Sequence, residues 1–136
     1  MQNFDRQSPP TAFEALQTHP GAMLIDCRTR AEWVYVGVPV LPNKTQKIAF
    51  IEWVDATGQP NTNFLSAVAQ IASKDTPLYI LCRSGVRSAA ACQFLAESGF
   101  TTLINIEDGF EGDIGPSGHR ANINGWKYCN LPWTQG

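Results

Sequence analysis

The chain has 136 residues, of which 43% are hydrophobic, and it carries 10 basic and 12 acidic residues. This length suits one domain with its own core, and the near-balance of charge offers no global attraction for nucleic acid or an anionic membrane. The sequence also lacks a signal peptide and any run approaching the roughly 18 apolar residues of a membrane span. We therefore expect a single cytoplasmic domain over residues 1–136, with no nucleic-acid or membrane partner.

The amino-terminal part of the chain predicts a helix followed by a buried strand. Ser8-Pro9-Pro10 is typical of a helix start, because a serine cap and an early proline both suit the first turn. His19-Pro20-Gly21 predicts the end of this helix. The apolar residues 22–25 predict a short strand that is buried on both faces. Residues 1–7 precede these elements, and we expect them to form an N-terminal extension.

The middle of the chain continues the alternation of helices and strands. Thr29 predicts the cap of a short helix that runs to Tyr35. Residues 47–51 predict a second strand, although their alternation of apolar and polar residues is weak. Residues 61–73 carry apolar side chains at helical spacing, which predicts an amphipathic helix.

The second half of the chain continues the alternation of strands and helices and then predicts a long loop. Strands are predicted over residues 77–81 and 102–106, with a helix over residues 89–98 between them. Strands that alternate with helices are typical of βαβ units, so the sequence predicts an α/β domain with a parallel sheet. Residues 111–124 are rich in Gly, Asp, Ser and Asn and predict a long loop. Such a loop either forms a lip for a substrate or partner or is plain surface elaboration.

Seven residues between the strand at 77–81 and the next helix carry the most informative chemistry. In a parallel sheet, ligands bind at the carboxyl ends of strands, and N–H groups that turn toward a helix start bind anions. Gly85 allows a tight turn, and Ser88 can cap the helix. These surroundings favour the thiolate of Cys82, which is the nucleophilic form of a cysteine. This cysteine loop reads Cys82-Arg83-Ser84-Gly85-Val86-Arg87-Ser88.

The cysteine loop resembles the active-site loop of the rhodanese sulfurtransferase family, whose pattern is Cys-Arg-x-Gly-x-Arg/Thr-Ser/Ala. Residues 24–33 are similar to the family's Asp-x-Arg-x-x-x-Glu-Trp segment, and residues 103–110 and 125–132 are similar to its last core strand and closing segment. The resemblance implies a three-layer α/β/α fold with a central, mainly parallel sheet of about five strands. Relative to the commonest family pattern, residues 111–124 look like an insertion.

The resemblance implies a thiosulfate sulfurtransferase-like enzyme with Cys82 as its catalytic nucleophile. Cys82 would take a sulfane sulfur from thiosulfate or another small anionic or persulfide donor and hold it as a covalent persulfide. It would then pass the sulfur to a thiol, cyanide or a protein cysteine, with no further cofactor. Arg83 and Arg87 either bind the oxyanion end of the donor or form structural or solvated charges. Main-chain N–H groups for the substrate are expected from Ser84, Gly85, Val86 and Ser88.

Asp26 and Arg28 are expected to support this site from the neighbouring strand. Asp26 falls at the carboxyl end of the first predicted strand, and the resemblance places both residues near the cysteine loop. Arg28 and Glu32 are spaced i, i+4 and are expected to pair on one helix face. We interpret Asp26 and Arg28 as a structural network that orients loops, with direct catalysis as the alternative.

The other cysteines are expected to have no part in the chemistry. Cys92 lies within an apolar predicted helix, and Cys27 lies inside the Asp-x-Arg segment; we expect both to pack in the core. Cys129 would resolve a persulfide or disulfide only if folding brings it beside Cys82. Neither the four cysteines nor the two histidines have metal-ligand spacing, so no metal site is expected.

Two other functions remain open at this stage. One is a cysteine-based phosphatase or arsenate reductase, since cell-cycle phosphatases resemble rhodaneses in fold. Those phosphatases have five residues between Cys and Arg, whereas four residues separate Cys82 from Arg87 here. The other is a non-catalytic rhodanese-like binding module, although such modules commonly lack the cysteine. The sequence leaves the oligomeric state and the order of the strands open.

Overall fold

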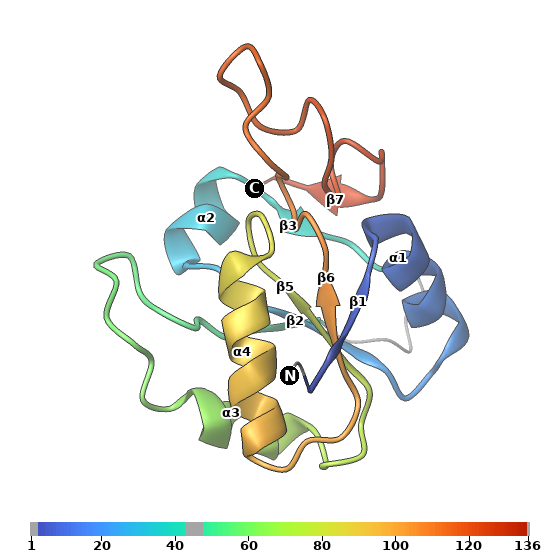
Figure 1. Ribbon diagram of the computed structural model, residues 1–136, viewed down its shortest axis with the longest axis vertical. Coiled ribbons are helices and arrows are strands. Elements are labelled where there is room, and N and C mark those ends of the chain that lie inside the picture. The colour runs from blue at the N-terminus through green and yellow to red at the C-terminus, as the bar shows by residue number, and fades with distance from the viewer. Residues whose placement is uncertain (1–2, 43–47, 136) are drawn as a thin grey trace.

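A computed structural model describes residues 3–42 and 48–135 and has a five-stranded sheet at its centre (Figure 1). The strands lie in the order β1-β6-β5-β2-β4, and every neighbouring pair is parallel. This arrangement confirms the predicted α/β class and places β5 in the middle of the sheet. The strands are β1 (Asp5–Gln7), β2 (Met23–Asp26), β4 (Ile48–Phe50), β5 (Leu78–Leu81) and β6 (Leu103–Ile106).

Helices cover both faces of this sheet (Figure 1). Side chains alternate along the central strands, so that Ile25 and Ile80 face one core and Leu24 and Leu81 face the other. Helices α3 and α4 close the first core, and α1 closes the second, which confirms the predicted three-layer α/β/α fold. The helices are α1 (Pro9–Thr18), α2 (Arg30–Tyr35), α3 (Phe64–Ile71) and α4 (Val86–Glu97).

The amino-terminal segment corrects one expectation. Residues 1–7 are predicted to be an extension, but Asp5–Gln7 forms the edge strand β1, which pairs in parallel with β6. Asp5 lies opposite Ile104, and Gln7 lies opposite Ile106. The strand has no apolar alternation because it is short and exposed, and main-chain pairing with a single neighbour holds it. Residues 1–2 lie outside the described part of the chain.

The remaining elements follow the sequence closely. Ser8 caps α1, and Thr29 forms a capping box with Glu32 at the start of α2. The strand predicted over residues 47–51 is β4, which pairs with β2 alone in the sheet. Its first predicted residue, Lys47, lies outside the described residues. The helix predicted over residues 61–73 is α3, which is shorter at both ends.

Two short strands form a small second sheet outside the central one, and the sequence analysis does not predict it. Strand β3 (Val38–Pro39) pairs antiparallel with β7 (Trp133–Thr134). Gly37 precedes β3 with a φ of 117°, and a Cβ there would lie 2.8 Å from the Thr134 carbonyl oxygen. Only glycine combines this conformation with such a close approach.

The chain between β6 and β7 forms turns and loops throughout, as predicted for residues 111–124 (Figure 1). This long segment lies at the same end of the molecule as the start of α4. Within residues 3–42 and 48–135, no helix has both the length and the apolar composition needed to cross a membrane.

Candidate active site

Cys82 is the first residue after β5 and lies at the carboxyl edge of the sheet, as predicted. The cysteine loop turns from β5 into α4, and Gly85 caps the helix with a φ of 103°. Glycine adopts this left-handed conformation without the strain that a side chain would cause. The turn brings the main chain of Gly85 back toward the sulfur of Cys82.

Two groups donate hydrogen bonds to this sulfur. The Gly85 N–H lies 3.1 Å from Cys82 Sγ, and the Ser88 hydroxyl lies 3.3 Å from it. The Cys82 residue is 1% exposed, so the sulfur is buried but has polar partners. Both donors stabilise negative charge on the sulfur. Among the hydrogen bonds of the described residues, only one main-chain N–H reaches Sγ, fewer than the cradle of N–H groups that the sequence predicts.

Ser88 has a different position from the predicted helix cap. Gly85 caps α4, so Ser88 lies inside the first turn with a buried side chain. Its Oγ contacts both Cys82 Sγ and Asn105 Oδ1. Asn105 is held in this orientation because its Nδ2 donates to the Gly85 carbonyl at 3.2 Å. A hydroxyl has one proton, so Ser88 can donate to Asn105 beside a thiol and to the sulfur beside a thiolate.

Asn105 is a site residue that the sequence analysis does not identify. It belongs to β6, whose other residues are apolar, and it is 5% exposed. A buried amide needs hydrogen-bond partners, and both partners of Asn105 are in the cysteine loop. A polar residue within an apolar strand is the signal that could have identified it.

Arg87 forms an ion pair with Glu32 of α2. Its two terminal nitrogens donate to the two carboxylate oxygens at 2.7 and 2.9 Å. This is the structural alternative for Arg87, because both ends of its guanidinium are engaged. The predicted pair between Arg28 and Glu32 is wrong, since Arg28 precedes α2 and pairs with Asp26 instead. The Glu32–Arg87 pair ties the start of α2 to the cysteine loop.

The pKa of Glu32 predicts an acid-sensitive contribution to stability. Burial opposes ionisation, but hydrogen bonds from Arg87 and Thr29 and the charge of Arg87 lower the pKa from 4.5 to about 2. The folded-state pKa lies below the unfolded one, so the stabilisation is present above about pH 4.5 and is lost as the pH falls toward 2. We expect Glu32→Gln to lower the free energy of unfolding by about 1 to 2 kcal/mol at neutral pH, allowing for solvent screening.

Urea unfolding of both proteins at about pH 7 and about pH 3 measures this effect. The difference between the parent and Glu32→Gln is expected to shrink at the lower pH. A difference that stays constant between the two pH values would contradict the assignment of this acid sensitivity to Glu32.

Asp26 and Arg28 form a fully buried ion pair beneath the site. Arg28 Nη2 lies 2.7 Å from Asp26 Oδ2 and donates to the Gly37 carbonyl at 2.8 Å. The guanidinium carbon also lies 4.2 Å from the centre of the Phe110 ring. Phe110 in turn donates its N–H to the Cys82 carbonyl at 2.8 Å. This geometry supports the interpretation that the pair orients the chain around Cys82.

The rest of the cysteine loop faces outward. Arg83 is exposed, Ser84 is half-buried, and Val86 is 75% exposed at the start of α4. Val86 therefore adds an exposed apolar side chain to the outer face of the cysteine loop. The roles of these residues toward a substrate stay predictions.

Burial raises the pKa values of the other three cysteine thiols. Cys27 and Cys92 are buried in the same core as Cys82, as predicted. Burial, followed by the charge of Cys82, raises the pKa of the Cys92 thiol to about 12 and raises that of Cys27. Burial and Asp108 also raise the pKa of Cys129. These three side chains are therefore held as thiols at neutral pH.

The chain after β6 is anchored to the main chain of the cysteine loop. A Cβ on Gly109 would lie 2.5 Å from the carbonyl oxygens of Cys82 and Arg83, so only glycine fits there. The N–H of Trp126 donates to the Gly109 carbonyl at 2.8 Å, and that of Lys127 donates to the Phe110 carbonyl at 3.1 Å. Both ends of the 111–124 segment are thus fixed beside the site.

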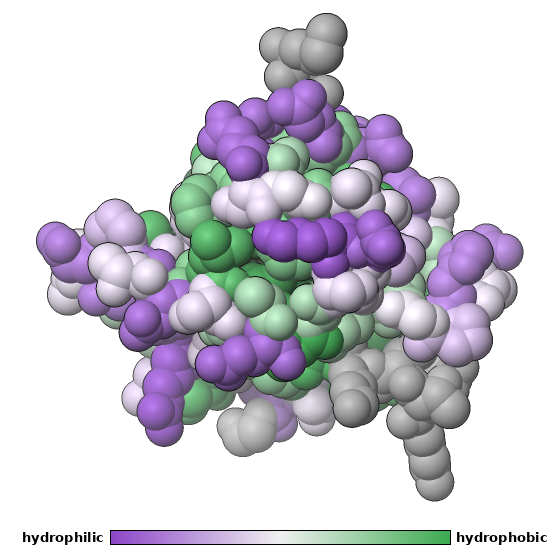
Figure 2. Space-filling model, turned by 90° about the horizontal axis from the view of Figure 1, so that it is seen from below, coloured by the Kyte–Doolittle hydropathy of each residue, from purple (hydrophilic) through white to green (hydrophobic). Residues whose placement is uncertain are grey.

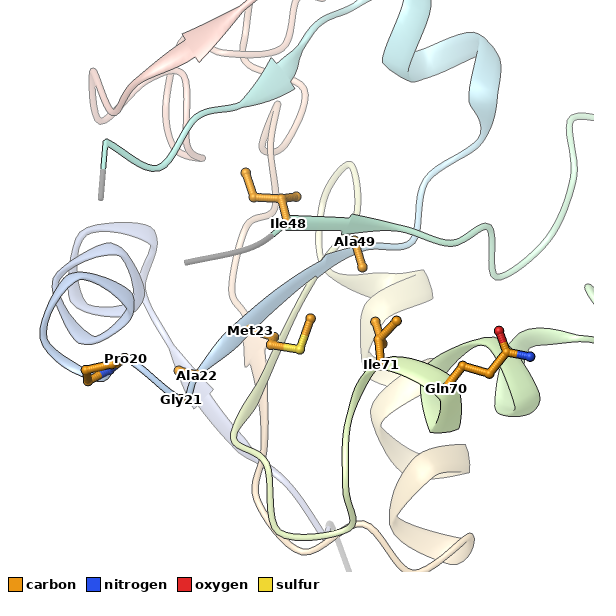
Figure 3. A pocket seen from close by; sticks show the side chains of 8 residues that line it. All are labelled: Pro20, Gly21, Ala22, Met23, Ile48, Ala49, Gln70 and Ile71. Carbon is orange, nitrogen blue, oxygen red and sulfur yellow. The ribbon is translucent and has the colours of Figure 1, made fainter. Parts of the chain in front are cut away.

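A hollow of about 650 Å³ lies away from the cysteine loop. Its walls come from the starts of β2 and β4 and from α3, and Figure 3 shows Met23, Ile48 and Ile71 around it. Among the residues that the structure describes, those that line this hollow include no cysteine, histidine or charged residue. Figure 2, which views the molecule from below, shows hydrophobic residues at the surface among hydrophilic ones.

No three histidine, cysteine, aspartate or glutamate side chains gather to hold a metal ion in the part of the chain that the structure describes. The cysteine loop itself places the Cys82 sulfur beside the hydrogen-bond donors of Gly85 and Ser88. The thiolate form of a cysteine can attack an electrophilic atom and form a covalent intermediate.

Comparisons with known proteins match most of this chain. A family model described as a rhodanese-like domain matches residues 9–113, which include the cysteine loop. An uncharacterized protein of Rickettsia conorii is 39% identical over 122 residues, covering 90% of this chain and 90% of that protein. Another relative, of Rickettsia rickettsii and also uncharacterized, is 38% identical over the same shares of both chains.

Solved structures extend the comparison to the fold. The crystal structure of Rv0390 from M. tuberculosis has a TM-score of 0.89 and 39% identity, and the match covers 97% of this chain and 98% of that one. The polysulfide-sulfur transferase homodimer from Wolinella succinogenes has a TM-score of 0.63 at 22% identity, covering 98% and 80%. The second likeness is one of fold alone. From the family match, the close relatives and the fold, we conclude that this chain belongs to the rhodanese-like domain family.

Proposed function

We propose that this chain is a sulfurtransferase that moves a sulfane sulfur through a persulfide on Cys82. The observation that carries the proposal is the sulfur at the end of β5, which accepts hydrogen bonds from the Gly85 N–H and the Ser88 hydroxyl. The Gly85 N–H is in place before the reaction, so it stabilises charge on the sulfur without reorganisation, and the Ser88 hydroxyl can turn its proton to the sulfur when the thiolate forms. Membership of the rhodanese-like family supports this class of chemistry.

The proposed reaction has two displacement steps. The Cys82 thiolate attacks the sulfane sulfur of thiosulfate, a new S–S bond forms, and sulfite leaves with the electron pair of the broken bond. An acceptor such as a thiolate, cyanide or a protein cysteine then attacks the outer sulfur, and the Cys82 thiolate leaves. Gly85 and Ser88 stabilise the Cys82 sulfur at the start and at the end of the cycle.

The proposal needs no cofactor beyond the persulfide. A nucleophilic thiol must stay reduced between cycles, which favours the cytoplasm. The alternatives remain a cysteine-based phosphatase or arsenate reductase and a non-catalytic binding module. The spacing between Cys82 and Arg87 and the pairing of Arg87 with Glu32 both favour sulfur transfer over binding of a phosphoryl group.

The reduced protein is treated with thiosulfate and digested, and mass spectrometry of its peptides tests the proposal. We expect a mass increase of one sulfur atom on the peptide that contains Cys82, and its loss when cyanide is added. Hydrolysis of an aryl phosphate without that mass increase would support the phosphatase. A protein that neither gains sulfur nor hydrolyses the phosphate would support the binding module.

A further inference from the structure

Cys82, Gly85, Ser88 and Asn105 form a closed ring of hydrogen bonds. The Gly85 N–H and the Ser88 hydroxyl lie 3.1 and 3.3 Å from Cys82 Sγ. The Ser88 hydroxyl also donates to Asn105 Oδ1, and Asn105 Nδ2 donates to the Gly85 carbonyl at 3.2 Å, which closes the ring. The side chains of Ser88 and Asn105 are buried, so water has little access to either of them.

The ring determines which atom of the Asn105 amide faces Ser88. A carbonyl oxygen only accepts hydrogen bonds, so the Gly85 carbonyl requires the Nδ2 group of Asn105 as its donor. The amide oxygen of Asn105 is thereby left facing the Ser88 hydroxyl, to which it offers lone pairs and no proton. Ser88 therefore has one proton and two acceptors, which are Asn105 Oδ1 and Cys82 Sγ.

The charge on the Cys82 sulfur decides which acceptor receives this proton. A thiolate is a stronger acceptor than a neutral amide oxygen, so the Ser88 proton turns to the sulfur when Cys82 ionises. The buried oxygen of Asn105 then loses the hydrogen bond from Ser88, which costs free energy. In a persulfide, Sγ is bonded to the transferred sulfur and carries no charge, so the Ser88 proton returns to Asn105.

Resting on the proposed sulfur transfer, we propose that Asn105 is a positioning residue that acts through Ser88 and favours the persulfide of Cys82 over its thiolate. Its amide oxygen competes with the sulfur for one proton, so the thiolate forms at the cost of the hydrogen bond between Ser88 and Asn105. Formation of the persulfide restores that bond. No atom or electron is transferred at Asn105, because only the direction of the Ser88 O–H bond changes.

Charged and titratable residues also lie on the elements around this ring. From the end of β2 to α2 they are Asp26, Cys27, Arg28 and Glu32. In the cysteine loop and α4 they are Arg83, Arg87 and Cys92. On β1 and in the chain after β6 they are Arg6, Glu107, Asp108, Glu111, Arg120 and Lys127. These residues are the same in every variant compared below, so differences between the variants report Ser88 and Asn105.

The ionisation of Cys82 in the reduced protein tests this competition without any sulfur transfer. Iodoacetamide reacts with the thiolate, and mass spectrometry of the Cys82 peptide gives the pH midpoint of that reaction. Ser88→Ala removes a donor to the thiolate, so the midpoint is expected to rise by about one pH unit. Asn105→Leu leaves the Ser88 proton to the sulfur alone, so the midpoint is expected to fall by about one pH unit.

A double variant, Ser88→Ala with Asn105→Leu, shows whether Asn105 acts through Ser88. Without the hydroxyl, replacing Asn105 is expected to move the midpoint by less than about 0.3 pH units. The matched control is Ser98→Ala at the far end of α4, where the hydroxyl donates to the Phe94 carbonyl at 2.9 Å. This control is expected to leave the midpoint unchanged. If Asn105→Leu does not fold, Asn105→Ala removes the same oxygen and carries the same expectation.

The two half-reactions are then followed separately, at a pH where Cys82 is fully ionised in both proteins. With Cys82 loaded by inorganic polysulfide, Asn105→Leu is expected to release sulfur to cyanide about threefold faster, because charge develops on Sγ without loss of the bond between Ser88 and Asn105. Loading of the thiolate from thiosulfate is expected to become about threefold slower for the same reason. A loop disturbed by the substitution would slow both steps.

Three outcomes would overturn the inference. They are a midpoint that Asn105→Leu raises or leaves unchanged, an equal effect of this substitution in the Ser88→Ala protein, and a slowing of both half-reactions. The proposed sulfur transfer would stand in each case, because Cys82 would still be loaded and discharged. Failure of Cys82 to take up sulfur from either thiosulfate or polysulfide would instead reject the proposed function, and the role of Asn105 with it.

Discussion

Replacing Cys82 with serine should reduce sulfur transfer from thiosulfate to cyanide to the rate of the uncatalysed reaction. The serine oxygen can still accept the hydrogen bond from the Gly85 N–H, so the geometry of the loop is retained. A hydroxyl cannot form a persulfide, and the covalent intermediate is lost with the sulfur. The transfer is measured as thiocyanate, which forms a coloured complex with ferric ion. Circular dichroism checks that the variant is folded.

Cys129→Ser is the matched control for this variant. Cys129 is partly exposed and contributes to neither core cluster, so its replacement should change stability little. We expect its transfer activity to equal that of the parent protein. Residual turnover in Cys82→Ser would reject Cys82 as the nucleophile, and a loss of turnover in Cys129→Ser would revive the possibility that Cys129 resolves the persulfide.

Asp26→Asn should lower the free energy of unfolding by about 3 to 5 kcal/mol, the largest stability effect that we expect of a single polar substitution in this chain. Asp26 and Arg28 are both 0% exposed, so neutralising the carboxylate leaves the guanidinium charge buried without its counterion. Urea unfolding measures the change as a shift of the midpoint at constant slope.

A double variant, Asp26→Asn with Arg28→Met, separates charge from packing. Removing both charges should recover part of the stability lost in Asp26→Asn, because no uncompensated ion remains in the core. Sulfur transfer should be impaired in the double variant, since the contact between Arg28 and Phe110 that supports the Cys82 carbonyl is also changed. A double variant less stable than Asp26→Asn would show that packing of Arg28 outweighs its charge.

The parts of the fold that local sequence patterns determine could be predicted. The strands at residues 22–25 and 77–81 are apolar because both of their faces are buried, and this produces a signal readable without a structure. The cap at Thr29 is similarly local, since its hydrogen-bond partner Glu32 is three residues away. The position of Cys82 follows from the strand that precedes it.

The parts that depend on partners distant in sequence could not be predicted. Strand β1 has no pattern of its own, because pairing with β6 rather than burial of its side chains holds it in place. In the sequence, Glu32 is spaced to pair with Arg28, whereas in the folded chain it pairs with Arg87. The donors to Cys82 were expected from the main chain, whereas one of them is the side chain of Ser88, held by Asn105 from β6.

Because both ends of the 111–124 segment are anchored, its length can change without changing the hydrogen bonds around Cys82. Hydrogen bonds at Gly109, Phe110, Trp126 and Lys127 anchor the segment, and the N–H groups of Glu111 and Gly112 also donate to the Arg83 carbonyl at 3.0 and 3.1 Å. Closing a flexible loop costs free energy that grows only slowly with the number of residues, so insertions or deletions between these anchors are inexpensive. The stretch between these anchors can therefore be lengthened, shortened or replaced while the hydrogen bonds around Cys82 are kept.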